Sequence, residues 1–108
     1  MKLLLISGST LGRGNDEVGA ILMEKLMTHM AQSDAHPKTV FFYNTGVRLT
    51  PEGSPILPYL QALRVKGTRL LACGTCLDYF KIRPADGIEP STMKAMVELL
   101  NQGDVVTL

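Results

Sequence analysis

The sequence contains two cysteines, Cys73 and Cys76, separated by two residues directly after the apolar run 70–72. That run is typical of a buried strand, and a thiol at the end of such a strand lies at the mouth of a sheet, where ligands can reach it. If a helical turn begins there, its amide groups favour the thiolate over the thiol. Two thiols at this spacing exchange disulfides, hold a metal ion or carry sulfur, and the rest of the chain has to discriminate among these three chemistries.

The rest of the chain argues against a metal site and leaves a dithiol redox role open. A closed zinc site needs four ligands, the chain has no second Cys-x-x-Cys pair, and His29 and His36 show no ligand spacing, so we expect no metal. Cys-Gly-x-Cys is also the spacing of thioredoxin-like dithiols, which leaves a redox protein open. Here, however, the motif follows a third predicted strand and precedes a short segment that Pro84 interrupts. Gly74 and Thr75 make the stretch turn-like, which argues against a pair of buried structural cysteines.

Composition narrows the class of protein. The 108 residues are 45% apolar without tryptophan, which predicts one domain spanning residues 1–108 with an aliphatic core. The net charge of +1 argues against nucleic acid or an anionic membrane as the main partner. The apolar start at 3–6 is too short for a signal peptide, and no segment has the length of a membrane span. We therefore expect a cytoplasmic protein, in which the cysteine pair stays mostly reduced.

Strands and helices are predicted to alternate along the chain. Apolar runs predict strands at 3–6, 39–43, 68–72 and 104–108. Capping residues and glycine stops predict helices from Asn15 or Asp16 to about Gln32, from Pro55 to Gly67, and from Ser91 or Thr92 to Gly103, with a short helical segment in 73–80. The segments 47–54 and 81–90 are predicted to be irregular. The expected inner faces are Val18, Ile21, Leu22, Leu26 and Met30 in the first helix, and Met93, Met96, Val97 and Leu100 in the last.

This order predicts an α/β fold whose mostly parallel sheet is covered by helices on both sides. Ligands of such sheets bind beyond the carboxyl ends of the strands. The distinctive residues of this chain follow three predicted strands, in the segments 7–15, 44–46 and 73–78. Besides the two cysteines, the residues expected to line the site are Gly12, Arg13, Asn44, Thr45, Gly74, Thr75 and Asp78.

The glycine-rich segment 8–14 invites a phosphate-binding interpretation but fails its specific tests. It lacks the Gly-Lys-Ser/Thr ending of a P-loop, and Glu17 stands where a dinucleotide fingerprint has its third glycine. We expect a tight turn and no bound cofactor, with Arg13 supplying a cation for a thiolate or an anionic substrate. A module that binds a small anionic ligand or flavin at the strand ends remains the alternative. Asp78 is a candidate proton acceptor near Cys76.

Three motifs in order give the chain a family resemblance. They are the segments 42–54, with Asn44-Thr45-Gly46 followed by Glu52-Gly53-Ser54, the run Cys73-Gly74-Thr75-Cys76-Leu77-Asp78-Tyr79, and the opening Gly12-Arg13-Gly14-Asn15-Asp16-Glu17-Val18-Gly19. Over nearly its whole length the chain resembles the DsrE-like domain of the YedF group, within the DsrE/DsrF-like family. The resemblance implies a three-layer α/β/α sandwich that forms trimers or hexamers, and a sulfurtransferase-like role linked to selenium metabolism.

The resemblance also implies roles for the two thiols. Sulfur-relay members of the wider family carry sulfur as a persulfide on one cysteine just after a strand, and the corresponding residue is Cys73. Cys76 is then an accessory thiol that resolves or stabilises the persulfide. The implied function is a carrier of sulfur or selenium that relays its cargo to a partner such as a TusA-like carrier protein. YedF proteins usually have an N-terminal TusA-like domain, so the chain is expected to be a single-domain relative or an excised domain.

Overall fold

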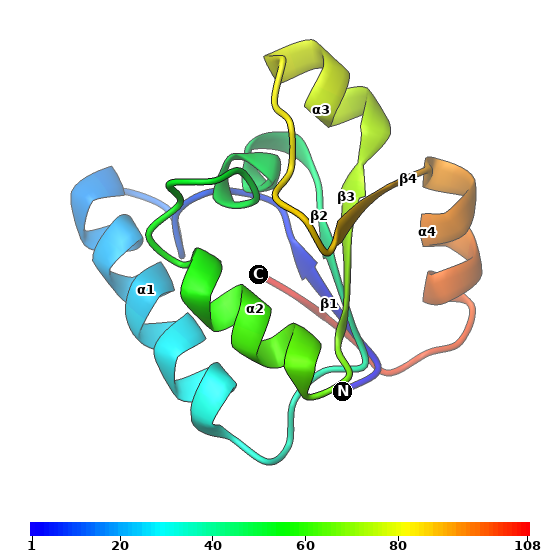
Figure 1. Cartoon of the computed structure of the whole chain (residues 1–108), viewed down its shortest axis with the longest axis horizontal. Helices are drawn as coiled ribbons and strands as arrows, with labels where there is room; N and C mark the ends of the chain where they lie inside the picture. Colours follow the sequence, from blue (N-terminus) through cyan, green and yellow to red (C-terminus); the bar gives the residue numbers. More distant parts are fainter.

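The structure, a computed structural model, describes residues 1–108. Five strands and four α-helices alternate along the chain, with one 3-10 helix after the second strand (Figure 1). In chain order they are β1 (Leu3–Ile6), α1 (Asp16–Gln32), β2 (Thr39–Phe42), η1 (Asn44–Leu49), α2 (Leu57–Val65), β3 (Arg69–Cys73), α3 (Gly74–Phe80), β4 (Ile88–Ser91), α4 (Met93–Leu100) and β5 (Val105–Thr107). The predicted α/β fold is confirmed.

All five strands are parallel and form one sheet in the order β4-β3-β2-β1-β5. The register places Leu5 beside Phe41, and Phe41 beside Leu71. Because the strands are parallel, their carboxyl ends share one edge of the sheet. The segments that follow β1, β2 and β3 therefore start from the same edge, as the sequence predicts.

The two faces of the sheet are covered unequally. Alternate strand residues point to opposite faces, and one face packs under α1 and α2 in a cluster of 17 buried residues. The other face packs under α4 in a cluster of only six, which includes Cys73 and Met96. Figure 1 shows α1 and α2 on one side of the sheet, α4 on the other, and α3 beyond the end of β3. Cys73 thus belongs to the thinner layer.

Helix α1 has its predicted bounds but not its predicted inner face. Asn15 caps it, with its side-chain oxygen accepting a hydrogen bond from the Val18 N–H at 2.9 Å. The buried residues are Gly19, Met23, Met27 and Ala31. Of the predicted inner residues, Val18, Ile21 and Leu22 are 43–51% exposed, so the prediction was wrong for these three, whereas Met30 is partly buried against the core. Gly19 explains why α1 is turned about its axis relative to the predicted orientation, because a Cβ there would lie 2.7 Å from the Thr10 Cβ. The loop before the helix packs directly on that glycine, and the row of residues four apart from it turns inward.

Helix α4 differs from expectation in the same way. Thr92 caps it by accepting a hydrogen bond from the Ala95 N–H at 3.1 Å, as predicted. Only Met96 is buried, while Met93, Val97 and Leu100 are exposed. One helix over a six-residue cluster has little sheet surface to cover, so most of the apolar stripe of α4 faces outward in the single chain.

Two elements fall in segments that were predicted to be irregular. The strand β4 has only one buried residue, Ile88, and contains Pro90, which has no N–H to give to a ladder. These features suit its place at the edge of the sheet. The 3-10 helix η1 replaces the start of the predicted loop and buries Val47 and Leu49. It carries the chain from the end of β2 to the region of the cysteines.

Candidate functional site

The cysteine pair sits where β3 passes directly into α3. Cys73 is both the last residue of β3 and the N-cap of α3, and Cys76 lies in the first turn of that helix. Cys73 is 3% exposed, packed with the cluster that contains Leu5, Phe41 and Met96. Cys76 is partly exposed and touches both apolar clusters. The two thiols are free and differ in access: one faces the core and the other faces solvent.

Cys76 has a polar partner that the sequence did not reveal. Its sulfur accepts a hydrogen bond from the backbone N–H of Asn44 at 3.1 Å. Asn44 begins η1 with a φ of +50°, in the left-handed region that asparagine tolerates better than most residues. This backbone conformation starts the turn directly after β2, beside α3. The contact joins the exits of two neighbouring strands through one N–H···S hydrogen bond.

The two sulfurs influence each other. Burial is the largest cause that raises the pKa of the Cys76 thiol above its ordinary value, and the Asn44 N–H works against that rise. A hydrogen bond to the Cys73 side chain and repulsion from a Cys73 thiolate raise the pKa of Cys76 further. A negative charge on Cys73 therefore favours the protonated form of Cys76.

Replacing Cys73 by alanine should lower the pKa of Cys76. The variant removes the hydrogen bond and the thiolate charge that raise this pKa and leaves the Asn44 contact that lowers it. The pH profile of iodoacetamide alkylation at Cys76 should shift to lower pH, so alkylation near neutral pH becomes faster because more thiolate is present. Peptide mass spectrometry assigns the modified residue. A profile that stays in place or moves to higher pH would contradict the coupling of the two sulfurs.

An open pocket of about 240 Å³ lies over Cys76, lined by Asn44, Thr75, Cys76, Tyr79 and Phe80. Tyr79 and Phe80 meet edge to face, with ring centroids 5.1 Å apart. Sequence reasoning missed both aromatic residues, although they follow Cys76 by three and four positions, the spacing that places helical side chains on one face. The pocket thus combines a partly exposed sulfur, an N–H donor and an aromatic wall.

The other residues expected at the site are only partly brought together. Gly12 and Arg13 line a separate pocket of about 350 Å³ at the ends of β1 and β5, with Ser7, Gly8, Thr10, Thr107 and Leu108. Thr45 approaches that loop, since its hydroxyl lies 3.5 Å from the position of a Cβ on Gly8. Gly74 packs near the Ser91 carbonyl. Asp78 is exposed, and its carboxylate makes no hydrogen bond or ion pair.

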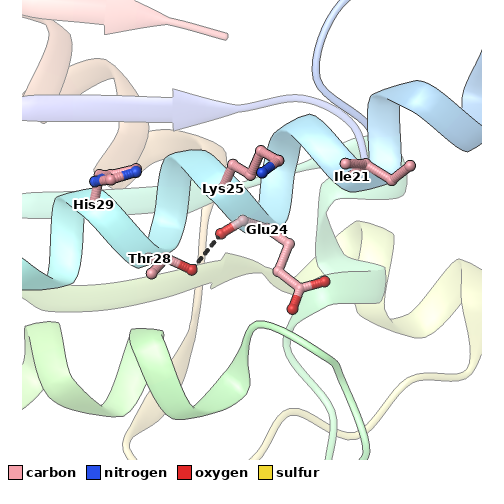
Figure 2. Close-up of a pocket in the computed structure, with 5 residues that line it drawn as sticks. All are labelled: Ile21, Glu24, Lys25, Thr28 and His29. Atoms are coloured by element: carbon pink, nitrogen blue, oxygen red, sulfur yellow. Dashed lines mark hydrogen bonds between the residues drawn. The ribbon is translucent and has the colours of Figure 1, made fainter.

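A separate groove of about 390 Å³ lies on the outer surface of α1. Figure 2 shows its lining residues, Ile21, Glu24, Lys25, Thr28 and His29, all on that one helix. The Thr28 hydroxyl donates to the Glu24 carbonyl at 2.7 Å, within the helix itself. No strand end contributes to the groove, and no group of three metal-ligating side chains occurs there or elsewhere. The groove therefore takes no part in the cysteine site.

The helices of the structure are all too short or too polar to cross a membrane. His36, the histidine outside α1, lies at the opposite end of the sheet and is within 3.0 Å of the Thr68 hydroxyl. That hydroxyl donates to the Pro37 carbonyl at 2.7 Å, so the contact fastens the starts of β2 and β3 together. Neither histidine lines the pocket over Cys76.

Comparison with solved structures finds the same fold in several proteins. The ychN protein of E. coli is 18% identical, with a TM-score of 0.68, and the match covers 99% of this chain and 98% of that one. MTH1491 of Methanobacterium thermoautotrophicum, a protein of unknown function, is 18% identical with a TM-score of 0.70, covering 98% and 96% of the two chains. BT1422 of Bacteroides thetaiotaomicron, also of unknown function, is 17% identical with a TM-score of 0.66, covering 99% and 95%.

At 17–18% identity, these matches show a shared fold and not a shared function. Among curated proteins, none matches the sequence. The family model of the DsrE/DsrF-like family matches residues 9–108, which include every strand end described above except that of β1. The cysteine pair, the η1 segment and the pocket between them all lie inside this match. The chain belongs to the DsrE/DsrF-like family.

Proposed function

We propose that this protein is a cysteine-based carrier that accepts sulfane sulfur as a persulfide at the Cys73–Cys76 pair and relays it to a partner. The observation that carries the proposal is the Cys76 sulfur, which faces an open pocket, accepts the Asn44 N–H and interacts with a second free thiol. Membership of the DsrE/DsrF-like family is consistent with sulfur relay. A reducing compartment such as the cytoplasm would keep both thiols available.

Loading begins at Cys76, because this is the thiol that a donor meets. Its thiolate attacks the outer sulfur of a donor persulfide R–S–SH, forming a new S–S bond to Cys76. The S–S bond within the donor breaks, and the leaving thiolate R–S⁻ takes the electron pair. The proton of the donor persulfide remains on the transferred sulfur or passes to solvent. The Asn44 N–H stabilises negative charge on the Cys76 sulfur before attack and again when the sulfur leaves.

Cys73 holds the cargo. Its thiolate attacks the outer sulfur of the Cys76 persulfide, which returns Cys76 to a thiolate and places the persulfide on Cys73. The family resemblance implies that Cys73, after the third strand, bears the persulfide, and the 3% exposure of this residue is a second reason for that role. A persulfide in the core is shielded from water and from stray thiols. The reverse step returns the sulfur to Cys76 for delivery.

The partner in this proposal is a TusA-like carrier protein, which either donates the sulfur or receives it. The resemblance to the YedF group adds selenium as a second cargo, since a selenium atom can occupy the outer position of the same bond. The test is transfer: protein loaded with sulfur and freed of donor should add the mass of one sulfur atom to a TusA-like acceptor. Protein that loads but never transfers to any acceptor thiol would contradict the carrier role.

The proposal also includes assembly as a trimer or hexamer. Met93, Val97 and Leu100 form an apolar stripe on the outer side of α4, and nothing in the single chain covers it. Apolar residues gathered on one exposed helix face are typical of protein interfaces. The stripe lies over the cluster that contains Cys73, so a neighbouring subunit there would thicken the thinner layer of the sheet.

The substitution Val97→Glu should weaken this assembly by about tenfold to a hundredfold, because it buries an unpaired charge in the interface. Sedimentation velocity over a range of concentrations measures the shift towards monomer. Val65→Glu on α2 is the matched control, since Val65 is 85% exposed and lies outside the stripe. If both variants assemble like the wild type, α4 is not the interface.

A further inference from the structure

Arg48 is the one cation held against the wall of the cysteine pocket. It lies in η1, four residues after Asn44, and its guanidinium carbon is 4.8 Å from the centroid of the Phe80 ring. Phe80 lines the pocket together with Cys76. A guanidinium at this distance over an aromatic face is attracted by the ring and is less free to move than an ordinary surface arginine. The stacking therefore keeps a positive charge against Phe80, one of the residues that line the pocket.

The charge of Arg48 is not neutralised within the chain. The only ion pair in the structure joins the N-terminus to Asp104, and Arg48 has no hydrogen-bonded partner. Asp78, the acidic residue of α3, forms no pair with it. Arginine presents planar N–H donors that fit a carboxylate in a two-point contact. Because the Phe80 ring occupies one face of the guanidinium, the N–H groups along the edge of the guanidinium stay free to bind an anion.

We propose that Arg48, stacked on Phe80, selects small persulfide donors that carry a carboxylate near the reacting sulfur. The proposal rests on sulfur loading at Cys76 and names the class of donor for that site. A pocket of about 240 Å³ is below the size of a typical drug-binding site and suits a short organic chain. The aromatic wall covers the carbon chain of the donor, and the guanidinium receives its carboxylate.

This binding acts on the same transfer step. The Cys76 thiolate attacks the outer sulfur of ⁻OOC–R–S–SH, the donor S–S bond breaks, and ⁻OOC–R–S⁻ departs with the electron pair. The departing molecule carries one more negative charge near the pocket than the neutral-tailed equivalent would. Arg48 therefore binds and orients the donor for transfer, and the carboxylate that it holds keeps the same charge while the S–S bond breaks. It is a residue that determines specificity, separate from the thiols that carry the sulfur.

The test compares two persulfides of the same shape, those of 3-mercaptopropionate and of its carboxamide. Wild-type protein should load sulfur from the carboxylate donor about threefold to tenfold faster, the range of a partly exposed charge-assisted contact. Raising the ionic strength should narrow this difference. Arg48→Met, which keeps an apolar stem over Phe80, should load from both donors at equal rates. The preference of Arg48→Lys for the carboxylate donor should lie between that of the wild type and that of Arg48→Met, because lysine keeps the charge and loses the planar pair of N–H donors.

A neutral disulfide, 4,4′-dithiodipyridine, reports Cys76 reactivity in every variant and should react equally with all of them. Equal loading of the wild type from the two donors would overturn the inference and leave the carrier proposal standing. Loading from a protein persulfide but from neither small donor would overturn it as well. If no donor, small or protein, loads the wild type, the carrier proposal itself fails.

Discussion

Replacing Cys76 by serine should slow sulfur loading of the native protein by at least about tenfold. The remaining thiol, Cys73, is 3% exposed beneath the sheet end, and a donor reaches it only after the surrounding cluster opens. Each ~1.4 kcal/mol needed for that opening lowers the rate tenfold. Quenched time points analysed by intact mass give the loading rate directly.

The matched variant Cys73→Ser should load at least as fast as the wild type, because Cys76 keeps its pocket and its Asn44 contact and loses the Cys73 charge that raises its pKa. Its sulfur should be lost to cyanide sooner than that of the wild type, since it stays on the exposed thiol. A Cys76→Ser protein that loads as fast as the wild type would contradict the entry role of Cys76. It would place both loading and storage on Cys73.

The substitution Gly46→Ala should destabilise the protein by about 1–3 kcal/mol, the usual cost of forcing an extra methyl group into a packed position. A Cβ at Gly46 would run into the Ile6 carbonyl and lie 3.4 Å from the Gly8 nitrogen. The segment η1 would therefore have to move away from the end of β1. Urea unfolding measures the loss of stability.

The same substitution should raise the pKa of Cys76. Asn44 lies two residues before Gly46, and a shifted η1 weakens the N–H···S contact that lowers this pKa. Alkylation of Cys76 should then need higher pH. Gly8→Ala is the control, since its Cβ would meet the Thr45 hydroxyl at 3.5 Å and the Thr10 backbone at 3.7 Å and 4.0 Å, which are all ordinary contacts. A Gly46→Ala protein with wild-type stability and an unchanged pH profile would contradict the link between η1 and the thiol.

Most of the fold could be predicted because local patterns dominate it. The continuous apolar runs of β1, β2 and β3 and the caps Asn15 and Thr92 each indicate their structure from a few neighbouring residues. The inner faces of α1 and α4 could not be predicted in the same way. They depend on a loop packing against Gly19 and on how little sheet α4 covers, and both are contacts between distant segments.

The candidate site was predictable in place but not in detail. The Cys-Gly-Thr-Cys motif after an apolar run identified the end of β3, and Asn44 followed the neighbouring strand. That the Asn44 backbone, rather than its side chain, meets Cys76 depends on a left-handed φ that the sequence does not reveal. The stacking of Arg48 on Phe80 could not be predicted either, because it joins two segments that lie 32 positions apart in the sequence.

The most direct test of the account is the intact mass of native protein after exposure to a persulfide donor and removal of excess donor. The wild type should gain one sulfur atom, which peptide mapping locates on the segment containing Cys73 and Cys76, and reduction should remove it. A variant with both cysteines replaced by serine should gain none. A wild type whose two thiols are reactive but which gains no sulfur from any donor would contradict the central claim.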